Sequence, residues 1–462
     1  MGRKPGHSPL GTRRRWWSLW LLAAALAAVA ILAVACGDDD EEEATPTAAK
    51  TAAAETPAAE TPVAPPSAEG PLKIGLLLSY TGDLSDFGPP EEQAAQMAAD
   101  EINAAGGVLG QDIELVTGDD ATDPSQGVSE ATRLINVEGV HAIIGALASG
   151  VTLPVAESVT GPNAILQISH ASTSPALTAA NDNDFLFRTT ISDAAQGVVL
   201  AQLAQKEGIT SACTMYINNA YGQGLSEIFT ENFEKAGGTV TAQVPHESEQ
   251  ATYASELAQC TAGNPQALVA PCYPESARVF LREAVEAGNV QTFLFTDGTK
   301  SPDMFADLGW ETFDGMKGTA ATNLDVAAGS AFEERYTAAY GSTPSVPYMR
   351  EIYDAVYLIA LAAEQAGSTD PTAIRDAIRD IANAPGEIID PGTEGFTSAL
   401  ELIKAGTDIN YEGAAGPVDL DDNGDVLIGA IETWHVDAAA QDLVTDAVFK
   451  VDLTTGEVTE AQ

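Results

Sequence analysis

Hydrophobic and polar positions divide the chain into three parts. Residues 16–35 form a nearly uncharged apolar run that follows three arginines at 13–15. Residues 37–70 are acidic and then rich in Pro, Thr and Ala, with no apolar periodicity. From residue 71 onward, short apolar runs alternate with segments whose apolar positions recur at helical spacing. Only this third part has the pattern of a packed fold.

The first series of alternating elements lies between residues 72 and 169. Its apolar runs predict these strands: 72–78, 113–120, 140–146 and 163–169. Its helix patterns cover these segments: 89–105, 124–137 and 151–160. Strands joined through helices form a parallel sheet with both faces covered, so the series predicts an α/β lobe.

A second series of the same kind begins near residue 192. Its predicted helices are 193–206, 221–235, 250–261 and 275–287, and its strands are 211–217, 239–245, 267–272 and 292–297. Further helices near 329–340, 347–366 and 371–382 precede a β-rich stretch at 416–436. Two series predict two similar lobes with a cleft between them, and ligands of such sheets bind at the carboxyl ends of the strands.

The amino-terminal pattern predicts export. A positive segment followed by an apolar run is typical of a signal peptide, here residues 1–35. The sequence Ala33-Val34-Ala35-Cys36 resembles a bacterial lipobox, whose cysteine is lipidated and becomes the new amino terminus. Residues 36–70 would then be the lipidated cysteine and a disordered linker. The alternative is a retained helix, because about 20 apolar residues can span a bilayer.

Composition excludes several classes of function. The net charge is -46 with only 21 Lys and Arg residues, so a surface that neutralises nucleic-acid phosphates is not expected. No Cys or His spacing predicts a metal site, and no cofactor motif is present. No nucleophile–base motif stands out either, so we predict a binding protein and not an enzyme.

The loops that follow the predicted strands resemble those of one family. They read "SYTGDLSDFG", "GDDATDP", "GALASGVTLPVA", "ISHASTSPALT", "NNAYGQG", "CYPES" and "FTDG". In order and spacing they are similar to the extracytoplasmic amino-acid-binding proteins of branched-chain amino-acid ABC transporters, the type 1 periplasmic binding proteins. The resemblance implies two Rossmann-like lobes, three crossovers that act as hinges, and an interlobe cleft. It places lobe 1 at 71–191 plus 322–430 and lobe 2 at 192–321 plus 431–462.

The resemblance also implies a set of ligand-binding residues. On lobe 1, the hydroxyl of Ser149 beside Gly150, the Ala171 backbone and the Thr173 hydroxyl match positions that bind a ligand's carboxylate and amino group. In lobe 2, Asp297 matches an acid that accepts the ammonium. The expected walls of the cleft are three aromatic residues, namely Tyr221, Tyr273 and Phe87. The alternatives are a helix cap for Ser149, a turn for Asp297 and ordinary packing for the tyrosines.

Three cysteines lie in the part with a packed pattern. Cys213 begins its predicted strand and Cys260 ends a helix that returns to the same end of the sheet, so we predict a disulfide between them. Cys272 lies at the opposite, cleft end and is expected to be a free thiol. Three unpaired buried thiols are the alternative.

The sequence thus predicts a lipid-anchored receptor at the cell surface or in the periplasm. Its expected ligand is an amino acid, branched-chain or similarly apolar, which it delivers to ABC-transporter permease subunits. One alternative keeps the trap but binds a short amide, urea or an aromatic acid. The other is a surface hydrolase or a ligand-sensing module on the same fold.

Overall fold

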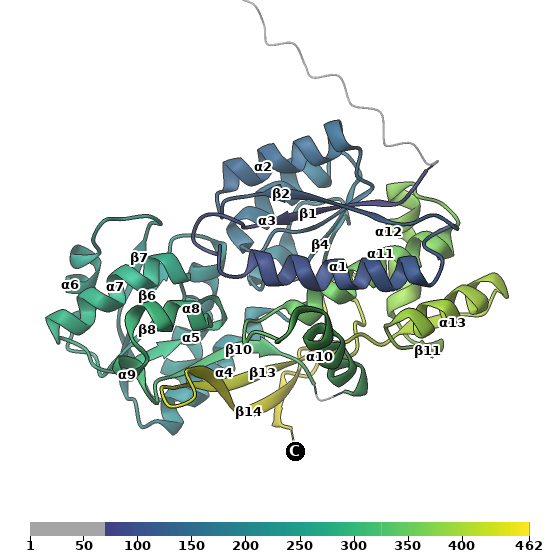
Figure 1. Ribbon diagram of the computed structural model, residues 1–462. Coiled ribbons are helices and arrows are strands. Elements are labelled where there is room, and N and C mark those ends of the chain that lie inside the picture. The colour runs from purple at the N-terminus through teal and green to yellow at the C-terminus, as the bar shows by residue number, and fades with distance from the viewer. Residues whose placement is uncertain (1–69, 325, 462) are drawn as a thin grey trace, which may run out of the picture. The chain divides into compact units, whose positions relative to one another are not determined.

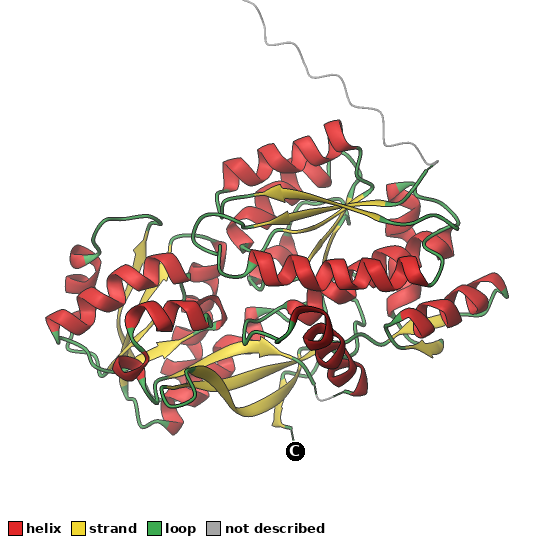
Figure 2. Cartoon of the chain, viewed as in Figure 1, coloured by secondary structure: helices red, strands yellow, loops and turns green. Residues whose placement is uncertain are grey.

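Two separate β-sheets organise the chain (Figure 2). The computed structural model describes residues 70–324 and 326–461. Apart from Gly70, the predictions for residues 1–35, Cys36 and the linker at 36–70 lie outside the described residues. Among the described residues, no helix combines the length and apolar character that a membrane span needs.

The first sheet is parallel, with the order β2-β1-β3-β4-β5. Its strands are β1 (Lys73–Leu78), β2 (Glu114–Asp119), β3 (Ala142–Gly145), β4 (Leu166–Ser169) and β5 (Leu186–Arg188). Every residue of β1 except Lys73 is buried, because helices pack on both faces of the sheet (Figure 1).

The helices of this lobe come from both ends of the chain. They are α1 (Gly88–Ala104), α2 (Pro124–Arg133), α3 (Ser149–Val155), α10 (Ala327–Tyr340), α11 (Met349–Ala366), α12 (Pro371–Ala382) and α13 (Thr393–Lys404). π-Helical turns η1 (Leu134–Glu138) and η2 (Ala156–Thr160) extend α2 and α3, and the 3-10 turn η3 is Pro175–Ala179. Helix α11 packs against α1 and α12, and β11 (Glu387–Ile389) pairs with β12 (Ile409–Tyr411) as a small extra sheet.

The second sheet is mixed, with the order β15-β14-β13-β10-β9-β8-β6-β7. Its parallel strands are β6 (Ser211–Ile217), β7 (Thr239–His246), β8 (Ala267–Val269), β9 (Phe293–Phe295) and β10 (Lys317–Thr322). The antiparallel strands are β13 (Ile428–Asp437), β14 (Asp442–Asp452) and β15 (Glu457–Glu460). The helices of this lobe are α4 (Asp193–Lys206), α5 (Ala220–Lys235), α6 (Ala254–Thr261), α7 (Pro274–Ala287), α8 (Pro302–Leu308) and α9 (Trp310–Phe313), with the 3-10 turn η4 (Asp297–Thr299).

The chain passes between the two lobes three times: after β5, after β10 and before β13. The predicted α/β class with two lobes and three crossovers is confirmed. The residue-level boundaries of the lobes remain predictions. The predicted start of one helix is wrong, because α6 begins at Ala254 and not at 250. The backbone N–H of Gln250 donates to the Tyr253 hydroxyl, and the backbone N–H of Tyr253 donates to Glu283 Oε2 at 2.8 Å, so neither makes a helical hydrogen bond.

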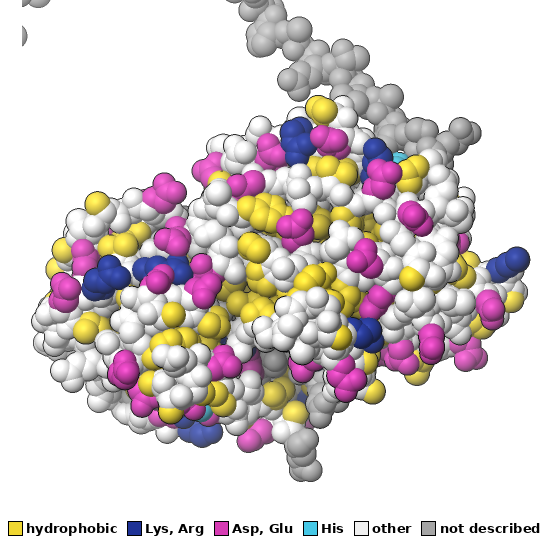
Figure 3. Space-filling model, viewed as in Figure 1, with side chains coloured by type: hydrophobic (Ala, Val, Ile, Leu, Met, Phe, Trp, Pro, Cys, Tyr) yellow, Lys and Arg dark blue, Asp and Glu magenta, His cyan; other side chains and the backbone are white. Residues whose placement is uncertain are grey.

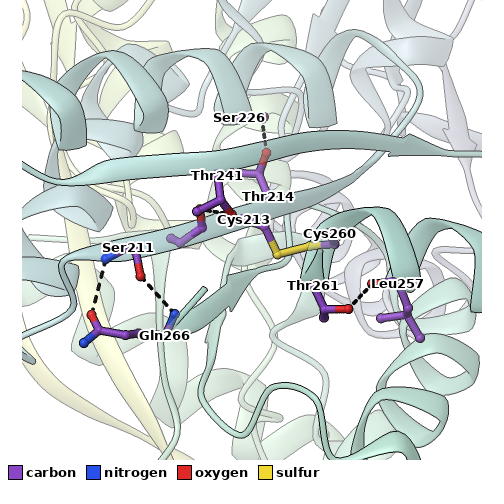
Figure 4. Close-up of a disulfide and its surroundings, with 10 residues drawn as sticks. Ser211, Cys213, Thr214, Ser226, Thr241, Leu257, Cys260, Thr261 and Gln266 are labelled. Carbon is purple, nitrogen blue, oxygen red and sulfur yellow. Dashed lines mark hydrogen bonds between the residues drawn. A yellow bond between two sulfur atoms is a disulfide. The ribbon is translucent and has the colours of Figure 1, made fainter. Parts of the chain in front are cut away.

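A disulfide joins β6 to α6 in the second lobe (Figure 4). Cys213 and Cys260 have Cα atoms 5.5 Å apart, which is a usual spacing for a bridged pair. Cys272, just after β8, is buried and free. The three cysteines therefore lie as the direction of strands and helices predicts.

Candidate functional site

A small cavity lies between the lobes, at the carboxyl ends of the strands. The residues that line it are Leu84, Phe87, Leu147, Ser149, Ala171, Tyr221, Tyr273, Asp297, Gly298 and Tyr348. Six of them were predicted ligand-binding residues. Gly150 and Thr173, the other two predicted residues, do not line the cavity.

Asp297 provides the acidic side chain of the cavity wall. It begins η4, separated from β9 by the N-cap residue Thr296, and only 3 % of its surface is exposed. Its Oδ1 atom accepts hydrogen bonds from Gln196 Nε2 and from the Tyr221 hydroxyl, both at 2.7 Å. Its Oδ2 atom accepts from the Tyr348 hydroxyl at 2.7 Å. All three donors are neutral, so they orient the carboxylate without cancelling its charge.

Two stacked tyrosines form the lobe 2 wall. The rings of Tyr221 and Tyr273 are nearly parallel, with centroids 5.4 Å apart and planes 10° apart. Tyr221 lies in the first turn of α5, and Tyr273 is the N-cap residue of α7. Asn219 holds both: its side chain caps α5 at Gly222 and donates to the Tyr273 hydroxyl at 3.1 Å. The wall is thus apolar on its ring faces and rigid at its polar ends.

The lobe 1 wall combines apolar side chains with small polar groups. Leu84 and Phe87 come from the loop after β1, and Leu147 from the loop after β3. Ser149 is the first residue of α3, and its side chain makes no cap, so the helix-cap alternative is wrong. Its hydroxyl instead accepts from the backbone N–H of Ser174 at 3.2 Å.

The two predicted residues outside the cavity still lie close to it. The Thr173 hydroxyl donates to Asp193 Oδ2 at 2.8 Å. Gly150 faces lobe 2, where a Cβ atom would lie 2.9 Å from the Cβ of Asn219. Glycine at this position therefore lets the two lobes approach closely.

Three residues around Asp297 were not predicted from the sequence. Tyr348 precedes α11 in a left-handed conformation (φ +69°), which is uncommon for tyrosine. Asp193 and Gln196 lie in the first turn of α4. Their spacing of three, which places both on one face of a helix, was the available signal.

Burial shapes the electrostatics of the cavity. It raises the pKa of Asp297, while the hydrogen bonds from Tyr348, Tyr221 and Gln196 lower it in part. Burial first, and the charge of Asp297 second, raise the pKa of Asp193 well above its usual value. Burial also raises the pKa of the Tyr221 and Tyr348 hydroxyls, so both are neutral donors at physiological pH. The site is therefore a low-dielectric acceptor for a positively charged group.

Contacts between the lobes flank the cavity. The Ser276 hydroxyl at the start of α7 donates to Asp83 Oδ2 at 2.7 Å. Arg278 Nη2 donates to Asp86 Oδ2 at 2.8 Å. Both acids lie in the same loop as Leu84 and Phe87, so closure of the lobes and formation of the cavity wall are linked.

Comparison with known proteins decides the family. A profile described as "Periplasmic binding protein" matches residues 71–424. The chain belongs to the periplasmic binding protein family. The resemblance of its loops to that family is thereby confirmed, and with it an extracytoplasmic solute-binding role.

Individual relatives agree with this assignment. The chemotactic signal transduction system substrate-binding protein BasB of Halobacterium salinarum is 28% identical over 361 residues, which are 76% of this chain and 83% of BasB. The leucine-, isoleucine-, valine-, threonine- and alanine-binding protein of Pseudomonas aeruginosa is 27% identical over 309 residues, 67% of this chain and 82% of that protein. A solved leucine-binding protein of Thermotoga maritima superposes with a TM-score of 0.69 and 26% identity over 82% of this chain and 98% of its own.

Proposed function

We propose that the protein captures an amino acid with a small apolar side chain, of the branched-chain kind, and delivers it to the permease of an ABC transporter. The observation that carries this proposal is Asp297. It is a buried carboxylate in the wall of an otherwise aromatic and apolar cavity, and its hydrogen-bond donors are all neutral. Such a group needs a cation, and the ammonium of an amino acid supplies one.

The remaining ligand groups have matching positions in the cavity. The Ser149 hydroxyl and the backbone of Ala171, on the opposite lobe, are placed to bind the carboxylate. In this proposal the Thr173 hydroxyl stays bonded to Asp193, outside the cavity lining, and does not contact the ligand. The ring faces of Tyr221 and Tyr273 cover the apolar side chain together with Phe87 from lobe 1. The names of the Pseudomonas and Thermotoga relatives support leucine and its analogues as the ligand class.

Delivery of the ligand to the permease depends on closure of the two lobes. A ligand that contacts Asp297 on one lobe and Ser149 on the other favours the closed arrangement, which a permease can distinguish from an open one. In this proposal Cys36 carries a lipid and the linker holds the receptor near its permease at raised effective concentration. The acidic surface suits an exposed, soluble receptor (Figure 3).

A sensory role is the second candidate, because the name of BasB places that relative in chemotactic signalling. The cavity would bind the same ligands in that case. A pull-down from membranes distinguishes the two roles, since a transport receptor binds its permease and a sensor binds a chemoreceptor.

Calorimetric titration of the purified protein, stripped of ligand by unfolding and refolding, tests the ligand class. The panel is the twenty amino acids, short amides, urea and benzoate. Tight binding of Leu, Ile or Val is expected. Binding of an amide, urea or benzoate without any amino acid would keep the fold and contradict the proposed ligand.

A further inference from the structure

The first turn of α4 faces Asp297 with two polar side chains. Asp193 and Gln196 are three residues apart and therefore share one face of the helix. The Gln196 amide nitrogen reaches Asp297 Oδ1 at 2.7 Å and the Thr319 backbone oxygen at 3.2 Å. Because these are acceptors, the amide NH2 must point at them, and its oxygen points elsewhere. Asp193 is fully buried beside this amide.

The buried oxygens of Asp193 and Gln196 outnumber the hydrogen-bond donors that reach them. The Thr173 hydroxyl satisfies Asp193 Oδ2, but Asp193 Oδ1 and Gln196 Oε1 are both buried without a partner among the described residues. Buried acceptors are rarely left unpaired. A proton on Asp193 converts one of these acceptors into a donor and so lowers the number of buried acceptors that lack a partner.

The charges around Asp193 lead to the same result. The cation whose charge lowers the pKa of Asp193 is Arg188, and that guanidinium is already bound to Asp425 Oδ1 at 2.6 Å and to the Ser174 carbonyl at 3.0 Å. The other charge that acts on Asp193 is that of Asp297, and the charge of Asp193 in turn acts on the hydroxyls of three tyrosines. These tyrosines are Tyr221, Tyr273 and Tyr348, whose pKa values are all raised by burial. Two buried carboxylates without a free cation do not both ionise.

We propose that Asp193 holds a proton in the unliganded protein and releases it to solvent when a ligand's ammonium binds at Asp297. The inference rests on the function proposed above. In this step the carboxylic acid of Asp193 becomes a carboxylate and its proton leaves to water, while the ligand's ammonium pairs with the carboxylate of Asp297. Asp193 is a positioning residue that acts through Asp297, so it needs no contact with the ligand.

The consequence is a pH-dependent affinity. Where the unliganded pair is protonated, binding must displace the proton, so affinity falls by up to about tenfold for each unit that the pH decreases. Where the pair is already ionised, affinity no longer changes with pH. Capture is thus weakened in acid although Leu itself keeps its ammonium.

Calorimetric titration of the full-length protein in detergent solution with L-leucine counts the released protons. The binding enthalpy is measured in buffers of different ionisation enthalpy at pH 5.5, 7 and 8. We expect a slope that corresponds to release of up to one proton per leucine. Asp193→Asn should abolish both the release and the pH dependence, because its carboxamide is permanently neutral. Asp112→Asn, which removes an exposed charge, should retain both.

The outcomes separate the two proposals. Leucine binding by the wild type with no proton release would overturn the coupling and leave the proposed function intact. This wild-type result needs no variant, so misfolding of Asp193→Asn cannot obscure it. Failure of every amino acid to bind would overturn the proposed function and this inference with it.

Discussion

Replacing Asp297 by asparagine removes the charge of the site and almost preserves its shape. The wild-type carboxylate accepts three hydrogen bonds of 2.7 Å, from Gln196, Tyr221 and Tyr348. An asparagine keeps one oxygen for two of these donors, and the Tyr348 hydroxyl can rotate to accept from its NH2. The aromatic wall should therefore stay in place while the partner of the ammonium loses its charge.

The expected loss of affinity follows from that charge. A hydrogen bond to a charged group contributes about 1.5–3 kcal/mol, and removing one partner of a buried charge pair costs about 2–5 kcal/mol. Because asparagine retains an acceptor, we expect about 2–3 kcal/mol, which is roughly a 30- to 150-fold weaker Kd. Stability should not fall, since burial raises the pKa of Asp297 and its ionised form is disfavoured in the folded protein.

Titration calorimetry with leucine and thermal unfolding together provide the assay. The matched control is Asp354→Asn on α11, another buried acid, whose pKa is raised by burial to about 6. Its carboxylate accepts from the Tyr411 hydroxyl and from the backbone of Ala414, each at 2.8 Å, away from the cavity. The control should lower stability and leave the Kd unchanged, because backbone N–H groups donate to both carboxylate oxygens of Asp354 and one of them would face the NH2 group of the asparagine. Wild-type affinity in Asp297→Asn would refute the assignment of the ammonium site.

Three further predictions concern closure, stability and pH. Arg278→Gln removes the ion pair with Asp86 between the lobes. Because this pair is partly exposed, we expect the substitution to weaken ligand binding by about 0.2–1 kcal/mol. Stopped-flow measurements should show the loss mainly as faster dissociation of the ligand. Cys260→Ser opens a loop of 47 residues and should lower the free energy of unfolding by about 4 kcal/mol in urea titrations, whereas an unchanged midpoint would mean that the bridge does not form in solution. Burial raises the pKa of acids such as Asp354, to about 6, so the folded protein binds their protons more tightly than the unfolded chain does. The stability that these protons contribute is present at low pH and is lost as the pH rises through 6. The thermal midpoint should be higher at pH 5 than at pH 8, and the opposite order would contradict the sign of these shifts.

The parallel strands β5 and β10 were not predicted, because β5 has only three residues and β10 consists of Gly, Ala, Thr and Lys. Several other parallel strands could be predicted because helices cover both faces of the sheet. Strand β1 is a continuous apolar run for that reason, whereas in the helices between the strands the apolar positions recur every three or four residues. Strands β14 and β15 escaped prediction, because their residues are largely exposed or half-buried and give no apolar run. The antiparallel edge they build is set by pairing with β13, which no local pattern encodes.

The site could be predicted in part from its loops. Each loop that follows a parallel strand lies at the cleft edge of a sheet, so Ser149, Ala171 and Asp297 were within reach of the argument. Tyr348 was not, because it follows no strand and reaches Asp297 from a segment 51 residues away, through an uncommon backbone conformation. Asp193 and Gln196 were missed because their importance depends on burial beside Asp297, and burial of an acid is visible only in the packed fold.

The central claim is that the cavity selects an amino acid through a buried carboxylate that accepts its ammonium. Its most direct test compares leucine with 4-methylpentanoate, which has the same carbon skeleton and carboxylate but no amine, by calorimetry on the same protein. The account predicts micromolar or tighter binding of leucine and at least a hundredfold weaker binding of the acid, because Asp297 would be buried against it without a partner. Equal affinity for the two compounds would contradict the account.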